Sequence, residues 1–424
     1  MFSSFSTFSL PSLPRILGGN PGAAIDLKSV DIHDVEIQHE KRARTLKHLL
    51  KLNHANHAIL YHHLQFDNHT PHVAYLLGAS AEHLDDVYEK EHKELEPWID
   101  SPGEISTFDW RDYLGDRHYQ RAFVDFFEDQ MVLNGYDWKL VVSKYLFEGS
   151  KPLINCLIGG LGHPLIHLGY AYELSSREVA MEALGLVATT YTFFHKYLDD
   201  ASYTKPSTYS TSSPVEILQK VAKDKRFDNL FDHQGADNIE PIFENHEAAV
   251  LEHWNAWQLP DPKKQFEESQ HAAVALLVAT HGSTNERKFD FFLVHVLTTT
   301  HAVRILLPII PAKFHVPVVR QWWLLTLAVY IAQVRPAIDL ERITGYDVKG
   351  KDWAWVEQEA VGGKWSLDAH YVKGLRAMKE AAKTWGDADQ YYLKAACKFG
   401  EKFDEWGGFG PIEAGARRGS ATGH

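Results

Sequence analysis

Histidine is the residue type in this chain best suited to do chemistry, and it is unusually abundant. The sequence holds 25 histidines among 424 residues, scattered along the chain instead of gathered in one run. The neutral imidazole is the commonest metal ligand among side chains, and its pKa lies closest to neutral pH. Histidines that can share one helical face are therefore the first candidates for a metal site.

A first group of eight histidines lies within residues 54–92. Inside it, Asn68 precedes an apolar run and is a suitable helix N-cap. His69 and His72 are three residues apart and would face the same side of that helix. We favour metal ligation by at least one of them. The alternative is a hydrogen-bonded core histidine beside a capping group.

The glycine-rich segment GGLGHPLIH (159–167) holds a second pair. Pro164 fits the first turn of a helix, and His163 and His167 are four residues apart on it. At that spacing two imidazoles can share one ion, and the apolar neighbours indicate a buried face. Two alternatives stay open. A glycine-rich helix start can hold an anion, and either histidine can instead bond a backbone carbonyl.

A third candidate, His295, interrupts the apolar helical segment FFLVHVL (291–297). A buried imidazole must pair its nitrogens, so His295 is either a metal ligand or a hydrogen-bonded core residue. His301 lies six residues further on, about 600° around the helix and therefore on another face. The two histidines cannot readily serve one ion, and we favour His295 because its neighbours are more apolar.

A carboxylate-rich di-iron centre is disfavoured. Its Glu-x-x-His spacing occurs at 36–39 and 89–92, but both segments are charged, and the run 85–96 is typical of a solvated face. A mononuclear site rich in histidine fits better, and imidazole suits iron, copper, zinc and nickel alike. The sequence has no nucleophile elbow, no P-loop and no dinucleotide fingerprint after a strand.

Charge and composition narrow the classes of partner. With 43 basic and 56 acidic side chains the formal net charge is −13, which disfavours nucleic acid and anionic membranes as partners. Cys156 and Cys397 are too few for a disulfide framework, which fits a reduced, cytoplasmic protein. The most apolar stretch, 291–311, is interrupted by His and Arg, so we expect no membrane-spanning helix.

Helical periodicity dominates, whereas alternating strand patterns are scarce. We predict an all-α protein with one large multi-helix body and a buried metal and substrate pocket. Residues 1–30 and 411–424 are expected to be flexible tails, and 31–410 an all-helical domain with an exposed loop near 203–214. Helices are predicted over roughly 40–61, 69–83, 119–133, 164–174, 179–197, 247–257, 265–280, 289–307, 322–334, 367–384 and 388–403.

Four segments resemble the questin oxidase-like family: NHTPHVAYLLGAS (68–80), GGLGHPLIHLGYAYEL (159–174), FDFFLVHVLTTTHAVR (289–304) and DAHYVKGLRA (368–377). The likeness runs in order through most of the chain, and its most specific part is the G-H-P-x-x-H-x-G-Y block. The resemblance implies a fungal oxygenase of aromatic polyketide biosynthesis. Such an enzyme uses O₂ to open a ring of an anthraquinone such as questin towards a benzophenone.

The resemblance also implies a cofactor and a ligand set. Some members look like flavin-free, non-haem Fe(II) enzymes with a carboxylated lysine, and others are described with NADPH as reductant; without a dinucleotide fingerprint, no flavin is expected here. Burial lowers the pKa of a lysine and so favours its reaction with CO₂. Lys373 is the candidate for the carboxylated lysine, and the alternative is that Lys373 is an ordinary surface lysine. By resemblance the metal ligands are His72, His163, His167, His295 and Lys373, with Lys394 as the alternative lysine, and we expect His69, His301 and His370 to move protons.

The expected partners are thus a small aromatic polyketide and O₂, with neither nucleic acid nor membrane. Three other functions stay open. They are an NADPH-dependent Baeyer–Villiger-type oxidase of the same substrates, a metal-dependent hydrolase that needs no O₂, and a non-catalytic protein that binds an aromatic metabolite and tolerates loss of its buried histidines.

Overall fold

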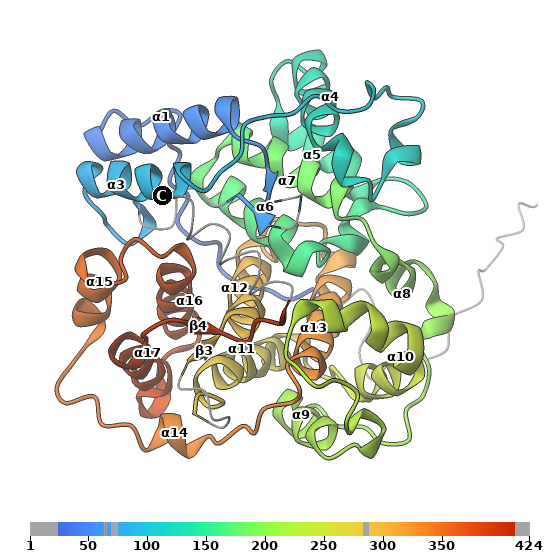
Figure 1. Ribbon diagram of the computed structural model, residues 1–424, viewed down its shortest axis with the longest axis vertical. Coiled ribbons are helices and arrows are strands. Elements are labelled where there is room, and N and C mark those ends of the chain that lie inside the picture. The colour runs from blue at the N-terminus through green and yellow to red at the C-terminus, as the bar shows by residue number, and fades with distance from the viewer. Residues whose placement is uncertain (1–23, 63, 65, 69–74, 283–287, 412–424) are drawn as a thin grey trace, which may run out of the picture.

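Helices carry most of the regular structure in the computed structural model, which confirms the predicted all-α class (Figure 1). The structure describes residues 24–62, 64, 66–68, 75–282 and 288–411. Within these ranges the α-helices are α1 Lys41–Asn56, α3 Ala81–His92, α4 Gln120–Leu133, α5 Trp138–Phe147, α6 His163–Leu174, α7 Arg177–Thr189, α8 Lys196–Asp199, α9 Pro214–Ala222, α10 Ile239–Ala256, α11 Pro262–Val278, α12 Phe291–Leu306, α13 His315–Ala332, α14 Glu341–Thr344, α15 Trp353–Gly362, α16 Ala369–Trp385 and α17 Tyr391–Lys402.

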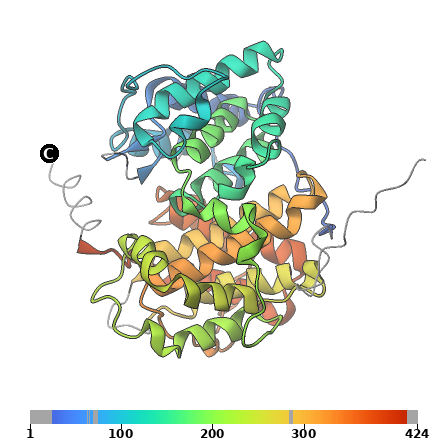
Figure 2. The same ribbon diagram turned by 90° about the vertical axis from the view of Figure 1, so that its right-hand side faces the viewer.

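The helices form two groups that share one apolar core. Figure 2 shows the group from α1 to α7 above the group from α9 to α17. Helix α6 joins the groups by packing against α12, and α12 also packs against α11, α13 and α16. The main cluster of buried apolar side chains draws on both groups. The interface of α6 with α12 is therefore where side chains from both groups can meet.

Helix α12 is enclosed on all sides because its sequence is apolar nearly throughout. Every residue from Phe291 to Leu306 is buried. The helix is N-capped by Asp290, whose carboxylate accepts hydrogen bonds from the N–H groups of Phe292 (2.8 Å) and Leu293 (2.9 Å). A polar side chain on such a helix must form a hydrogen bond or bind a ligand, because an unpaired buried polar group is costly.

The turn before α6 depends on glycine. Gly162 has φ +81°, and a Cβ on it would lie 2.4 Å from Cγ2 of Thr299 on α12. A Cβ on Gly159 would lie 2.0 Å from the carbonyl oxygen of Thr190, which follows α7. Only residues without a side chain allow these approaches. They let α6 begin directly against α12, with His163 in its first turn.

Besides α-helices and short 3-10 helices, the described ranges contain two pairs of two-residue strands. Strand β1 (Leu60–Tyr61) pairs antiparallel with β2 (Phe66–Asp67). Strand β3 (Phe289–Asp290) pairs in parallel with β4 (Trp406–Gly407). The second pair brings the C-terminal part of the chain beside the start of α12 (Figure 1).

The sequence patterns missed some helices. The charged run 85–96 falls largely in α3, which buries Leu84, Val87 and Tyr88 and leaves most of its acidic and basic residues exposed, with Glu91 half-buried. Helices α5 and α15 have ten residues each, too few for a clear periodic pattern. Helices α10 and α13 begin earlier than predicted, at residues 239 and 315. Of the helix predicted over 69–83, residues 69–74 lie outside the described ranges.

The structure describes only parts of the two segments that were expected to be flexible tails, and it describes the expected loop. Residues 1–23 and 412–424 lie outside the described ranges, but from residue 24 the chain packs on the body. Ile25 is buried, and its N–H donates to Nδ1 of His315 at 2.9 Å. Residues 204–213 contain no helix and link α8 to α9. Within the described ranges, no helix combines the length and the apolar character needed to cross a membrane.

Candidate metal centre

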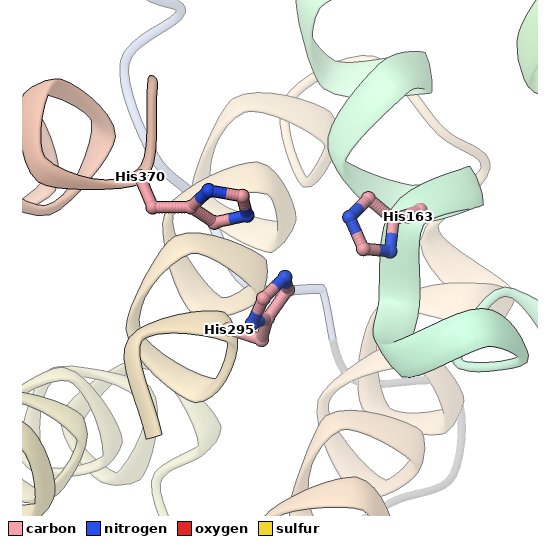
Figure 3. Close-up of side chains that lie close together, drawn as sticks. All are labelled: His163, His295 and His370. Carbon is pink, nitrogen blue, oxygen red and sulfur yellow. The ribbon is translucent and has the colours of Figure 1, made fainter. Parts of the chain in front are cut away.

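Three imidazoles from three helices meet where the two helix groups join (Figure 3). One nitrogen from each of His163, His295 and His370 lies within 4.8 Å of the others. The ring of His295 is the middle one, with its centroid 4.9 Å from the centroids of both other rings. In the part of the chain that the structure describes, this is the one set of histidine, cysteine or carboxylate groups close enough to share an ion.

His163 on α6 is held so that one nitrogen can face a metal ion. Its Nδ1 lies 2.6 Å from the carbonyl oxygen of Gly160 and 3.0 Å from Oδ2 of Asp67. A proton on Nδ1 that is donated to these oxygens leaves the lone pair on Nε2. Burial, followed by the neighbouring His295 and Lys373, lowers the pKa of His163 well below its ordinary value. The imidazole is therefore neutral, as a metal ligand must be.

His295 on α12 gives the clearest sign that the cluster binds something. The side chain is 0 % exposed, and its Nδ1 lies 2.8 Å from the carbonyl oxygen of Phe291. Its Nε2 is buried and has no hydrogen-bond partner within the described ranges. Burial, and after it the charge of Lys373, lowers the pKa of His295 to about 3. A buried, neutral nitrogen with an unused lone pair fits a metal ligand.

His370 completes the cluster from the start of α16. The helix is N-capped by Asp368, which accepts a hydrogen bond from the N–H of Tyr371 at 2.9 Å. The half-buried ring of His370 lies 4.9 Å from that of His295 and 4.5 Å from that of Phe291, centroid to centroid. From the sequence we expected His370 to move protons. The geometry brings it together with the two histidines expected as ligands.

Lys373 lies one helical turn after His370 and is 4 % exposed. Burial lowers its pKa to about 8, against the opposing charges of nearby carboxylates, chiefly Glu91. The charge of Lys373 in turn lowers the pKa values of His163 and His295. A buried ammonium thus lies beside the imidazole cluster.

Asp67 is a member of the site that sequence reasoning missed. It is buried at the end of β2, and burial raises its pKa to about 7 despite the positive charges of Arg117 and Lys373. A carboxylate that is hydrogen-bonded to a ligating histidine fixes the tautomer and orientation of the ring. The signal in the sequence was its place directly before Asn68, the expected N-cap.

Each of the three clustered histidines lies near the start of its helix. Helix α6 begins at His163, α12 at Phe291 and α16 at Ala369. A helix N-terminus carries about half a unit of positive charge. Such an end disfavours a protonated imidazole in the first turn of the helix, where His163 and His370 lie.

The other candidates that the structure describes are not members of the cluster. His167 is outside the three-histidine group, with its Nδ1 3.1 Å from the carbonyl oxygen of His163 and its Nε2 3.1 Å from that of Asn68. His301 accepts a hydrogen bond from Arg376 (3.2 Å). The alternative lysine, Lys394, lies on α17 and donates to the carbonyl oxygen of Thr344 (3.0 Å). The expected pair His69 and His72 lies outside the described ranges.

Comparisons with known proteins place the chain in a family. The family model for questin oxidase-like proteins matches residues 66–378, which include all three clustered histidines and Lys373. The chain belongs to the questin oxidase-like family. Two relatives are a Baeyer–Villiger oxidase, AgnL3, from Paecilomyces divaricatus (26% identical, covering 78% of this chain and 77% of the relative) and a questin oxidase from Aspergillus terreus (24% identical, covering 78% and 79%). A third is the Baeyer–Villiger monooxygenase AacuH from Aspergillus aculeatus (26% identical, covering 79% and 78%).

Proposed function

We propose that this protein is a non-haem iron oxygenase that cleaves a C–C bond in the quinone ring of a hydroxylated anthraquinone, within fungal aromatic polyketide biosynthesis. The observation that carries the proposal is the cluster of three imidazoles around the unpartnered Nε2 of His295. Membership of the questin oxidase-like family supports the substrate class. The names of its relatives, a questin oxidase and Baeyer–Villiger oxidases, support oxidative chemistry.

In this proposal His163, His295 and His370 hold Fe(II). Imidazole ligands suit iron, and three protein nitrogens leave coordination positions for other ligands. When bound, the iron supplies the activation of O₂, which does not otherwise react readily with a closed-shell organic molecule. His72 remains a candidate for a further ligand. His167 also remains a candidate, but to bind a metal it must give up a hydrogen bond to the carbonyl oxygen of His163 or Asn68.

Lys373 is proposed to act as a carbamate. As an ammonium it would repel a metal cation held by its neighbours His163 and His295. Because its pKa is lowered to about 8, part of the population is neutral amine near pH 7. The lone pair of Nζ then forms an N–C bond with CO₂, and one proton is lost to solvent. The cation is thereby replaced by an anionic oxygen donor.

The surrounding protein orients the reactants. Asp67 holds the ring of His163, and burial of His295 excludes bulk water. His69 and His301 are retained as candidates for proton transfer. Arg376 donates to Nε2 of His301, so a neutral His301 carries its proton on Nδ1.

The atoms balance if the substrate is the reduced hydroquinone. A hydroquinone and one O₂ together have the composition of the ring-opened benzophenone carboxylic acid, so no further reductant is consumed. From the quinone itself, two electrons must first be supplied, and NADPH is the candidate donor. A monooxygenase of the Baeyer–Villiger type would instead insert one oxygen atom, release the other as water, and leave a lactone to be hydrolysed.

A single-turnover reaction under ¹⁸O₂ tests this function. Iron-loaded protein and reduced questin are mixed, and the mass of the ring-opened product is measured. We expect two labelled oxygen atoms per product, and no product from His163→Ala or without O₂. One labelled atom would favour the monooxygenase. Turnover without O₂ would favour a hydrolase, and binding without product would favour a binding protein.

A further inference from the structure

The segment from Phe403 to Pro411, here called the C-terminal strap, runs beside the metal centre. Its strand β4 pairs with β3, which leads directly into α12 (Figure 1). The register sets Trp406 opposite Phe289 and Gly407 opposite Asp290. The match to the family model ends at residue 378, so the strap lies beyond it.

The strap is fastened to the N-caps of both helices that carry His295 and His370. The indole N–H of Trp406 donates to Oδ2 of Asp368, the N-cap of α16, at 3.0 Å. Gly408 has φ +85°, and a Cβ on it would lie 2.6 Å from Oδ2 of Asp290, the N-cap of α12. With its amide oriented to satisfy both groups, Gln333 donates to Asp290 (2.8 Å) and to the carbonyl oxygen of Gly408 (3.1 Å).

Aromatic rings connect the strap to the imidazoles. The ring of Phe291 has its centroid 4.9 Å from that of His295 and 4.5 Å from that of His370. Phe409 of the strap packs on Phe291 at 5.0 Å. Trp406 is 6.3 Å from His370 but is buried and hydrogen-bonded, whereas Phe409 is only half-buried. Phe409 is therefore the half-exposed ring of the strap, and it packs on Phe291, which contacts the rings of both His295 and His370.

We propose that Phe409, backed by Phe291, is the aromatic wall on which the flat ring system of the substrate packs, so that the strap sets substrate preference. Fused aromatic rings stack on a phenyl group in offset or edge-to-face geometry, and burial of both apolar surfaces adds to the affinity. Trp406 is the positioning residue, because its bond to Asp368 ties the strap to α16. The inference rests on the proposed function for the substrate class.

Binding of questin to the iron-loaded, full-length protein without O₂ tests the proposal by absorbance titration. In Phe409→Ala we expect the Kd for questin to rise about tenfold, while the Kd for phenol, which has one ring, changes less than about twofold. Phe409→Tyr keeps the aromatic face and should retain the wild-type Kd. Iron content should be unchanged in both variants, because Phe409 holds no metal.

The matched control is Phe147→Ala, which removes another half-buried ring, stacked on Phe314 with centroids 5.6 Å apart. It should leave the Kd for questin unchanged. An unchanged Kd for questin in Phe409→Ala, or an equal loss of affinity for questin and phenol, would contradict the proposal that Phe409 stacks on the substrate. So would loss of iron in Phe409→Ala, which would make the strap a support for the metal centre. Failure of the proposed function is a separate result, namely wild-type protein that binds questin but yields no product with O₂.

Discussion

Nδ1 of His163 and Oδ2 of Asp67 lie 3.0 Å apart, which joins the first residue of α6 to the end of strand β2. Both groups are buried, so the contact is shielded from water. A carboxylate in this position orients the imidazole and raises its basicity towards a metal ion. The pair therefore belongs to the proposed metal centre even though Asp67 is not one of the clustered groups.

We predict that Asp67→Asn lowers the affinity for Fe(II) about 10- to 100-fold, the usual effect of removing a carboxylate behind a ligating histidine. The amide keeps the size of the side chain and removes the charge. Competition with a coloured chelator measures the affinity. Asp31→Asn, which removes an exposed carboxylate near Lys383, is the control and should bind iron as the wild type does. Equal affinities for all three proteins would contradict the role given to Asp67.

Lys373 should make iron binding depend on CO₂. Wild-type protein reconstituted with Fe(II) in CO₂-free buffer should take up less iron than protein given bicarbonate, because the carbamate is then missing. Lys373→Ala should bind little iron with or without bicarbonate. Carbon-13 NMR of protein supplied with labelled bicarbonate should show one carbamate signal, which Lys373→Ala lacks.

A second buried lysine provides the matched control for that experiment. Burial also lowers the pKa of Lys398 to about 8, but its Nζ donates to the carbonyl oxygen of Val278 at 3.2 Å. Lys398→Ala should keep both the carbamate signal and the bicarbonate dependence. A carbamate signal that persists in Lys373→Ala would assign the modification to another lysine.

Gly162→Ala tests how closely α6 must approach α12. The new Cβ would meet Cγ2 of Thr299 at 2.4 Å, and the φ of +81° disfavours any side chain. We expect a loss of about 2–4 kcal/mol in the free energy of unfolding, together with weaker iron binding. Gly350 has a similar φ of +75°, but a Cβ on it would meet no atom within 4 Å, so Gly350→Ala should cost about 1 kcal/mol. Equal losses measured by urea unfolding would show that only backbone strain matters.

His54 should make stability depend on pH. It lies between Glu128 of α4 and Glu182 of α7, each at 2.9 Å. Burial alone would lower the pKa of His54, but the two carboxylates outweigh burial and raise it from 6.5 to about 10. A raised pKa in the folded state stabilises the protein fully below the unfolded pKa, and this contribution is lost as the pH rises from 6.5 towards 10.

The matching experiment compares the unfolding free energies of wild type and His54→Gln across that window. At pH 6 we expect the variant to be less stable by about 3 kcal/mol, because two carboxylates lose a buried cation. The difference should shrink steadily towards pH 10. His48→Gln, which replaces a histidine on the same helix that contacts neither carboxylate, should show no such trend. A constant difference across the window would refute the charged state of His54.

The sequence predicted two of the three clustered histidines for a clear physical reason. His163 follows glycines that permit close packing, and His295 interrupts an apolar helix, so both were marked as buried polar groups. His370 and Lys373 lie in a mixed polar and apolar segment at a helix start, a pattern that fits a surface equally well. Their burial arises from tertiary contact with α12, which periodicity does not reveal.

The parts that sequence reasoning missed depend on contacts between distant segments. Asp67 reaches His163 through a two-residue strand pair, and two-residue strands leave no alternating pattern. The C-terminal strap reaches the cluster through an equally short pair. Helix α3 was not predicted over its full length because its buried face has few apolar residues. Local pattern thus identified the long buried helices and left the short connections that complete the site unpredicted.

The central claim is that the three clustered histidines hold iron. The most direct test is the metal content of tag-free protein, reconstituted with Fe(II) and bicarbonate without O₂ and freed of excess metal, compared with that of His295→Ala. We predict about one iron per chain in the wild type and little in the variant, with the fold of both intact by circular dichroism. Equal iron in the two proteins, or no iron in either, would contradict the claim and leave His163, His295 and His370 as core residues.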